Sequence, residues 1–123
     1  MEYYAYIDEN NIVTQVITGM DHDDMSQGVD DWELFYSNLA NQRCLRTCID
    51  TVLGENVNGG EPFRGNFASV GFSYNEELDA FIAPKPFDSW TLNQNTFDWE
   101  APTTRPSSSH LWSEEEQSWF LPN

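Results

Sequence analysis

The chain has 123 residues, of which 21 are acidic and 5 are basic, so its formal net charge at pH 7 is −16. That length suits one domain, and a hydrophobic share of 39% with 15% aromatic residues argues against an intrinsically disordered chain. No apolar stretch approaches the roughly 20 residues of a membrane span, and the scattered basic residues offer no patch for the phosphates of a nucleic acid.

The chain opens with a predicted β-hairpin. β-Branched and aromatic residues fill positions 3–7 and 12–17, as is typical of strands. The polar residues at 8–11 between them favour a turn, so we expect these two strands to pair.

A short helix is predicted after an acidic loop at 19–31. It begins at Asp30 or Asp31, because acidic residues stabilise the positive N-terminal end of a helix. Its apolar residues recur at i, i+3, i+4 and i+7 and therefore share one face: Trp32, Phe35, Tyr36 and Leu39. A third strand, predicted at 43–50, completes a ββαβ lobe over residues 1–53.

Two cysteines, Cys44 and Cys48, lie in this predicted third strand. In an extended strand they are separated by about 13 Å, since each residue advances the chain by ~3.3 Å. A disulfide requires Cα atoms closer than about 7 Å, so we expect two free thiols. Without histidines at a suitable spacing, the pair also makes a poor zinc site.

Residues 54–66 are expected to form a loop that separates the lobe from an aromatic hairpin region over residues 67–123. Between Ala68 and Tyr74 apolar residues alternate with small polar ones, which predicts a half-buried strand. Residues 80–83 bring the chain back beside it, and two further hairpins are predicted, 89–92 with 97–99 and 110–112 with 118–120. The sequence therefore predicts an α+β, mainly β fold.

The three aromatic hairpins share an internal pattern, in which an apolar residue precedes a polar turn and an aromatic residue follows seven positions later. The pairs are Tyr74 with Phe81, Leu92 with Trp99, and Trp112 with Trp119. The pattern fits either a tandem repeat or the sequence preferences common to all short hairpins.

The sequence offers little for catalysis. The acidic loop fails as a calcium loop because, counting from Asp21, the sixth residue is Ser26 and the twelfth is Trp32. The two histidines, His22 and His110, lie far apart with no nucleophile motif around them. We therefore expect no enzyme activity, no metal and no cofactor.

The tryptophans of the hairpin region are the strongest candidates for contact with a partner. Their rings could stack on sugars, but cross-strand aromatic pairs also stabilise short hairpins, and we favour this second interpretation. Extended proline segments lose little entropy when they dock, so residues of the 84–87 segment join the candidates. The candidate partner contacts are Trp90, Trp99, Trp112, Trp119, Pro84, Pro86 and Phe87.

Five segments of the chain stand out: YIDENNIVTQVI at 6–17, PFRGNFASVGFSY at 62–74, DAFIAPKPFDSWTL at 79–92, WEAP at 99–102 and WSEEEQSW at 112–119. These segments resemble short acidic proteins encoded by tailed phages of marine cyanobacteria and other marine bacteria. The resemblance implies an accessory structural protein of the virion, which decorates or cements the capsid or tail surface. It transfers no catalytic or binding residues.

Three functions follow from these observations, and we favour the virion protein. It would bind a larger shell or tail protein, with self-association also open, and would contact neither nucleic acid nor a membrane. A carbohydrate- or receptor-binding module of the virion is the first alternative, and an acidic mimic of DNA that inhibits a host nuclease is the second. Because residues 1–4 lack the character of a signal peptide, we expect assembly in the host cytoplasm before incorporation into the virion.

Overall fold

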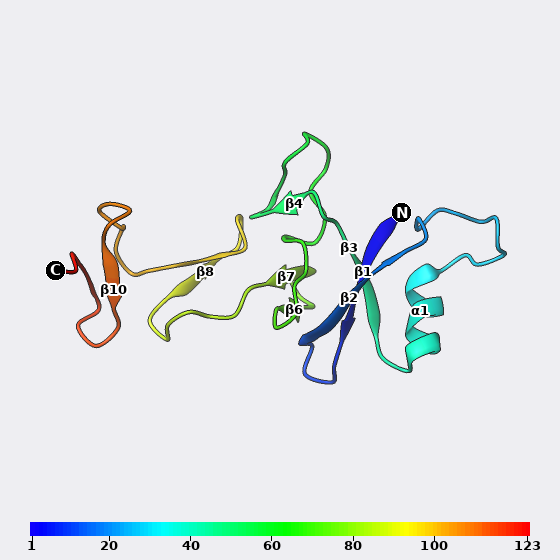
Figure 1. The fold of residues 1–123 in the computed structure, drawn as a ribbon, viewed down its shortest axis with the longest axis horizontal. Coiled ribbons are helices and arrows are strands. Elements are labelled where there is room, and N and C mark those ends of the chain that lie inside the picture. The colour runs from blue at the N-terminus through cyan, green and yellow to red at the C-terminus, as the bar shows by residue number, and fades with distance from the viewer.

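The fold, a computed structural model that describes all residues 1–123, is mainly β with one short helix (Figure 1). This confirms the predicted α+β, mainly β class. The elements are β1 (Glu2–Ile7), β2 (Val13–Gly19), α1 (Trp32–Ala40), β3 (Cys44–Thr47), β4 (Thr51–Val52), β5 (Glu55–Asn56), β6 (Ser73–Asn75), β7 (Ala80–Ile82), β8 (Thr91–Asn93), β9 (Asp98–Glu100), β10 (Leu111–Ser113) and β11 (Ser118–Phe120).

A three-stranded antiparallel sheet, in the order β2-β1-β3, is the centre of the fold. The turn from β1 to β2 is stabilised by the Asp8 carboxylate, which accepts the backbone N–H groups of Asn10 at 2.8 Å and Ile12 at 3.0 Å. Asn11 takes the left-handed conformation in this turn, with φ 62°. The predicted opening hairpin is thus confirmed.

Strand β1 is buried on both faces, which places the core of the protein around it. Alternate residues of a strand point to opposite sides, so Ala5 and Ile7 join one apolar cluster while Tyr4 and Tyr6 join another. The helix α1 covers the tyrosine side with Trp32, and the β6–β7 hairpin covers the other side. The result is three layers: helix, sheet and hairpin.

The helix begins where the sequence predicts, with Asp31 as its N-cap accepting the Leu34 N–H at 3.0 Å. Only part of the predicted apolar face is buried, however. Trp32 is 3% exposed and its indole N–H donates to the carbonyl of Asp24, whereas Leu39 is 72% exposed. The helix ends one residue after Leu39 and therefore packs on the sheet through its first two turns.

The prediction of a strand from Ala68 to Tyr74 is wrong over most of this segment, because β6 begins only at Ser73. Residues 69–71 turn instead, because Gly71 adopts a φ of 94° and the Phe72 N–H donates to the Ser69 carbonyl. Val70 is consequently 69% exposed. The backbone of this segment bonds the tip of the first hairpin, where the Val13 N–H donates to the Phe72 carbonyl at 2.8 Å.

The predicted third strand and the loop after it also differ from the structure. The strand predicted at 43–50 is shorter, since β3 ends at Thr47. Residues 54–66 do not form a loop throughout, because β5 pairs with β4 across Leu53 and Gly54. These two residues have φ values of 50° and 78°, the left-handed pair that a two-residue hairpin turn requires.

The three aromatic hairpins have the same backbone architecture. Each joins two three-residue strands through a four-residue turn, and the last turn residue has a positive φ in each: Asp79, Phe97 and Gln117. In each turn a side-chain oxygen accepts a backbone N–H three residues later: Asn75 from Leu78, Asn93 from Thr96, and Ser113 from Glu116. The pairs predicted from the internal pattern lie directly opposite each other across the strands. The three hairpins are therefore equivalent units.

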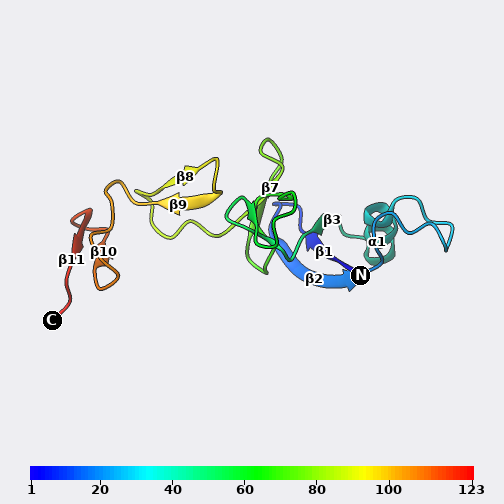
Figure 2. The same ribbon diagram turned by 90° about the horizontal axis from the view of Figure 1, so that it is seen from above.

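The molecule is elongated, with its last two hairpins running away from the layered part (Figures 1 and 2). Its accessible surface of 7853 Å² exceeds the value of about 6,800 Å² expected for a compact protein of 14.2 kDa. All 17 buried residues lie between Tyr4 and Ile82. We refer to residues 1–82 as the body and to residues 83–123 as the arm.

Replacing Phe81 by alanine should destabilise the body strongly. The side chain is 0% exposed in the core cluster beneath β1, and removing such a ring leaves a cavity that costs about 3–5 kcal/mol. Urea unfolding monitored by tryptophan fluorescence measures the loss. Val70→Ala is the matched control, because that side chain is exposed and its removal should change the free energy of unfolding by less than about 0.5 kcal/mol. Equal effects of the two substitutions would contradict the described core.

The two cysteines should be free but should differ in reactivity. Cys44 is 3% exposed, and burial raises the pKa of its thiol to about 12, so little thiolate exists at neutral pH. Cys48 is only partly buried. A maleimide reagent should therefore label Cys48 of the native protein first and both cysteines after denaturation without reductant. Failure of both thiols to react after denaturation would indicate a disulfide and contradict the extended strand.

Candidate docking surface

The arm consists of two similar units, each made of an extended strap followed by a hairpin. The first strap is residues 83–86 and leads to the hairpin β8–β9; the second strap is residues 103–106 and leads to β10–β11. Each strap carries a cation at its third position and proline at its fourth, namely Lys85-Pro86 and Arg105-Pro106. Proline cannot donate to a β-ladder, so both straps stay outside the strands.

Each strap is bound by the tryptophan of the second strand in its own hairpin. The Trp99 indole N–H donates to the Ala83 carbonyl at 2.7 Å, and the Trp119 indole N–H donates to the Thr103 carbonyl at 2.9 Å. In each of these two hydrogen bonds the donor and the acceptor residue lie 16 positions apart in the sequence. A cation stands over each ring, with Lys85 Nζ 5.7 Å from the Trp99 centroid and the Arg105 guanidinium 5.5 Å from that of Trp119. The two units thus use one interaction twice.

An aromatic cluster joins the two hairpins. Trp90, which precedes β8, has its ring centroid 5.9 Å from that of Trp112 and 6.0 Å from that of Trp119. Trp112 and Trp119 pair across β10–β11 at 5.1 Å, and Phe87 packs on Trp90 at 5.4 Å. Aromatic pairs at such distances contribute about 0.5–1.5 kcal/mol each beyond the area they bury.

Glu114, in the turn of β10–β11, is hydrogen-bonded to Ser89, the residue before Trp90. Its carboxylate accepts the Ser89 hydroxyl at 2.5 Å, the Ser89 N–H at 3.0 Å and the Trp112 indole N–H at 3.0 Å. These hydrogen bonds, led by that of the Ser89 hydroxyl, hold the pKa of Glu114 below its ordinary value. The contact stabilises the relative position of the hairpins in the ionised state of the carboxylate.

The arm meets the body at Asn66, which is 8% exposed. Its side-chain amide donates to the carbonyls of Phe81 in the body at 2.9 Å and Phe97 in the arm at 3.1 Å. The backbone also approaches closely here, since a Cβ on Gly54 would lie 2.4 Å from the Asn95 carbonyl oxygen. Glycine at position 54 therefore permits the turn of β8–β9 to seat against the body.

The structure gathers most of the residues that the sequence singled out. The aromatic cluster contains Trp90, Trp112, Trp119 and Phe87. Trp99 of β9 is hydrogen-bonded to the first strap. Pro84 and Pro86 are exposed on that strap and carry no described contact. The sequence does not predict the indole-to-carbonyl contacts, because their acceptors lie on segments without a regular pattern.

A cleft of about 430 Å³ opens between the two units of the arm. Three tryptophan rings, the last residue of β9, the two residues after it and part of the second strap line it: Trp90, Trp99, Glu100, Ala101, Pro102, Thr103, Thr104, Arg105 and Trp119. The indole nitrogen of Trp90 is buried and has no hydrogen-bond partner. The cleft thus combines aromatic faces with a carboxylate and a guanidinium.

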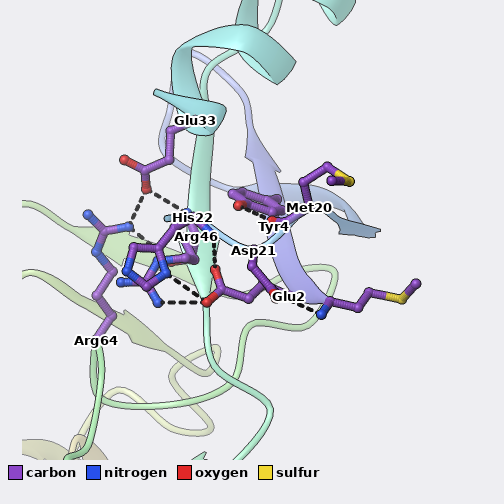
Figure 3. A network of polar contacts seen from close by, with 9 residues as sticks. Glu2, Tyr4, Met20, Asp21, His22, Glu33, Arg46 and Arg64 are labelled. Carbon is purple, nitrogen blue, oxygen red and sulfur yellow. Dashed lines mark hydrogen bonds and ion pairs between the residues drawn. The ribbon is translucent and has the colours of Figure 1, made fainter. Parts of the chain in front are cut away.

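The body contains a network of ion pairs and hydrogen bonds that connects its three layers, part of which is drawn in Figure 3. Glu33 of α1 accepts the Arg46 N–H of β3 at 2.6 Å and Arg64 Nη1 at 2.7 Å, and Arg64 Nε donates to Asp79 at 2.9 Å. Because Asp79 lies in the turn of β6–β7, Arg64 links the helix to the first aromatic hairpin. At the other end Glu2 bonds the His22 ring at 2.8 Å and pairs with Arg46 at 3.6 Å.

A cleft of about 360 Å³ lies beside this network, and both of its arginines face carboxylates. Its lining residues are Tyr4, His22, Asp30, Asp31, Trp32, Glu33, Arg46, Phe63 and Arg64. The hydrogen bonds of the network connect the helix, the sheet and the first aromatic hairpin.

Comparisons of the chain with protein-family models, curated proteins and solved structures find no match. The helix α1 has nine residues, and no helix of the protein has the length and apolar character needed to cross a membrane. No cluster of three or more histidine, cysteine, aspartate or glutamate side chains is arranged to hold a metal ion.

Acid should loosen the aromatic cluster, and Glu114→Gln should abolish that response. A carboxyl whose folded-state pKa is depressed stabilises the fold above its unfolded-state pKa, and the contribution disappears as the pH falls below about 4.5 through the folded-state pKa. The tryptophan signal in near-UV circular dichroism, followed from pH 7 to pH 3, measures the change. Glu115→Gln is the matched control and should titrate like the wild type. Identical pH profiles for the wild type and Glu114→Gln would contradict the role of this contact.

Proposed function

We propose that the protein is a non-enzymatic accessory structural protein of a tailed-phage particle. It attaches to a larger shell or tail protein through the arm, by contacts of its hairpins and straps. The observation that carries this proposal is the arm itself, in which none of the 41 residues from 83 to 123 is buried. The similarity of the sequence phrases to phage proteins supports the same function.

An arm of this construction gains stability from a partner. Hairpins with strands of three residues bury little surface, and two-stranded hairpins are marginal in water. Within the arm each hairpin relies on one strap and on the shared tryptophan cluster. Burial against a larger protein would add apolar contact at about 25 cal/mol per Å² without requiring the arm to refold. This favours a docking role for the arm.

The charge distribution favours a protein partner with a basic surface. The net charge is −16, and the arginines of the body face carboxylates: Arg43 pairs with Glu76, Arg46 with Glu2 and Arg64 with Glu33 and Asp79. A phosphate backbone would have to displace these acids before it could bind an arginine. Attraction to lysine- and arginine-rich surfaces would accelerate docking at low ionic strength.

A second candidate function is carbohydrate binding in the cleft of the arm. The cleft offers Trp90, Trp99 and Trp119 as ring faces, with Glu100 and Arg105 as hydrogen-bonding groups. Aromatic faces combined with a few polar groups are typical of ligand sites. This function requires an open cleft on the particle, whereas docking through the cleft would fill it.

The test of the proposed function is the composition of purified particles. Quantitative mass spectrometry of density-gradient-purified virions should find the protein at many copies per particle. Presence in the infected-cell lysate together with absence from virions would contradict a structural role and favour an inhibitor of a host protein.

Replacing Trp99 by alanine separates docking from sugar binding. The substitution removes the strap contact to Ala83 and the half-buried ring, and should destabilise the arm by about 1–3 kcal/mol, so incorporation into particles should fall. Incorporation is measured by the same mass spectrometry, and binding to an array of immobilised glycans is measured with the purified protein. Normal incorporation of Trp99→Ala together with lost binding to a glycan would favour the receptor-binding function.

A further inference from the structure

The three equivalent hairpins differ in the cross-strand pair at the open end of their outer faces. In each hairpin the first and last strand residues face away from the aromatic pair, because neighbouring residues of a strand point to opposite sides. These outer pairs are Ser73 with Ile82, Thr91 with Glu100, and Leu111 with Phe120.

The environment of each outer pair follows its chemistry in the first two hairpins. Ile82 is 4% exposed and lies within the body, so its apolar side chain is covered. Thr91 and Glu100 are polar and are exposed to solvent. In these two units the apolar member of an outer pair, Ile82, is buried, and the fully exposed outer pair, Thr91 with Glu100, is polar.

The last hairpin breaks this relation. Leu111 is 48% exposed and Phe120 is 42% exposed, and Leu121, the next residue, is 60% exposed. Single exposed apolar residues are ordinary, but Leu111 and Phe120 face each other across the strands and form an exposed apolar pair, which Leu121 follows in sequence.

We propose that the Leu111–Phe120 face is the surface through which the arm docks, and that its occupant is an apolar protein surface with a basic rim. This inference rests on the proposed function and specifies which face carries it. The charge near the face supports a basic rim, since residues 106–123 contain Glu114, Glu115 and Glu116 but no lysine or arginine. The arginine nearest in sequence, Arg105, donates hydrogen bonds to the carbonyls of Ser108 and His110.

A second copy of the chain fits this face less well. It would bring the same glutamates and a second charge of −16 to the contact, and like charges oppose association. The aromatic cluster is a poorer docking surface than the outer face, because Trp90, Trp112 and Trp119 already pack on one another. Leu111 and Phe120 of the outer face, by contrast, are 48% and 42% exposed.

The experiment measures binding of purified full-length protein to particles that lack it. The test variant is the double substitution Leu111→Ser with Phe120→Ser, and the matched control is Leu39→Ser with Val70→Ser, two residues of the body that are 72% and 69% exposed. Near-UV circular dichroism establishes that each variant retains the tryptophan cluster. The wild type and the control should bind alike, the test variant should bind at least about tenfold more weakly, and raised salt should weaken wild-type binding.

Other outcomes would overturn the inference in distinguishable ways. Equal binding of the test variant and the wild type would refute the outer face while leaving the virion function intact. No binding of the wild type to particles would contradict the proposed function and the inference together. Sedimentation velocity gives the remaining outcome, because a wild-type dimer that the test variant cannot form would identify a second copy as the occupant and contradict a basic partner.

Discussion

A hairpin with three-residue strands buries too little surface to be stable alone, and this constraint shapes the whole chain. The first aromatic hairpin meets it by packing Phe81 beneath β1 as part of the body. The second and third meet it within the arm, where Trp99 and Trp119 each hold a strap and the tryptophan cluster lies between the hairpins. Among the three hairpins, only the last leaves an apolar outer pair, Leu111 with Phe120, exposed to solvent, and for this reason a partner is proposed there.

The sequence predicts the fold well where local signals decide the structure. The turn residues after β1, the N-cap Asp31 and the three aromatic pairs all lie where the pattern indicates. The errors arise where one backbone angle outweighs an apolar pattern. Gly71, at φ 94°, breaks an alternating strand, and the left-handed Leu53–Gly54 pair makes a hairpin within an expected loop. The exposure of Leu39 depends on the position of the helix on the sheet, and the spacing of apolar residues in the sequence does not predict that position.

The arm shows which features of a site a sequence carries. The tryptophans were recognisable from their spacing, but the carbonyls that Trp99 and Trp119 bind lie on segments with no periodic signal, so these contacts require the three-dimensional structure. The apolar outer pair Leu111–Phe120 is different, because it is visible in the sequence once the three hairpins are aligned on their turns. That alignment depends on equivalent turn geometry, which only the shared positive φ and side-chain caps establish.

Amide hydrogen exchange of the free protein tests most directly whether the arm is an independent, marginal element that extends from a stable body. Amides of β1 should exchange only through global unfolding, because the strand is buried on both faces. Amides of β8 to β11 should exchange far faster, through local opening of hairpins that contain no buried residue. Protection in β8 to β11 equal to that in β1 would show that the arm and the body unfold as one unit and would contradict this description.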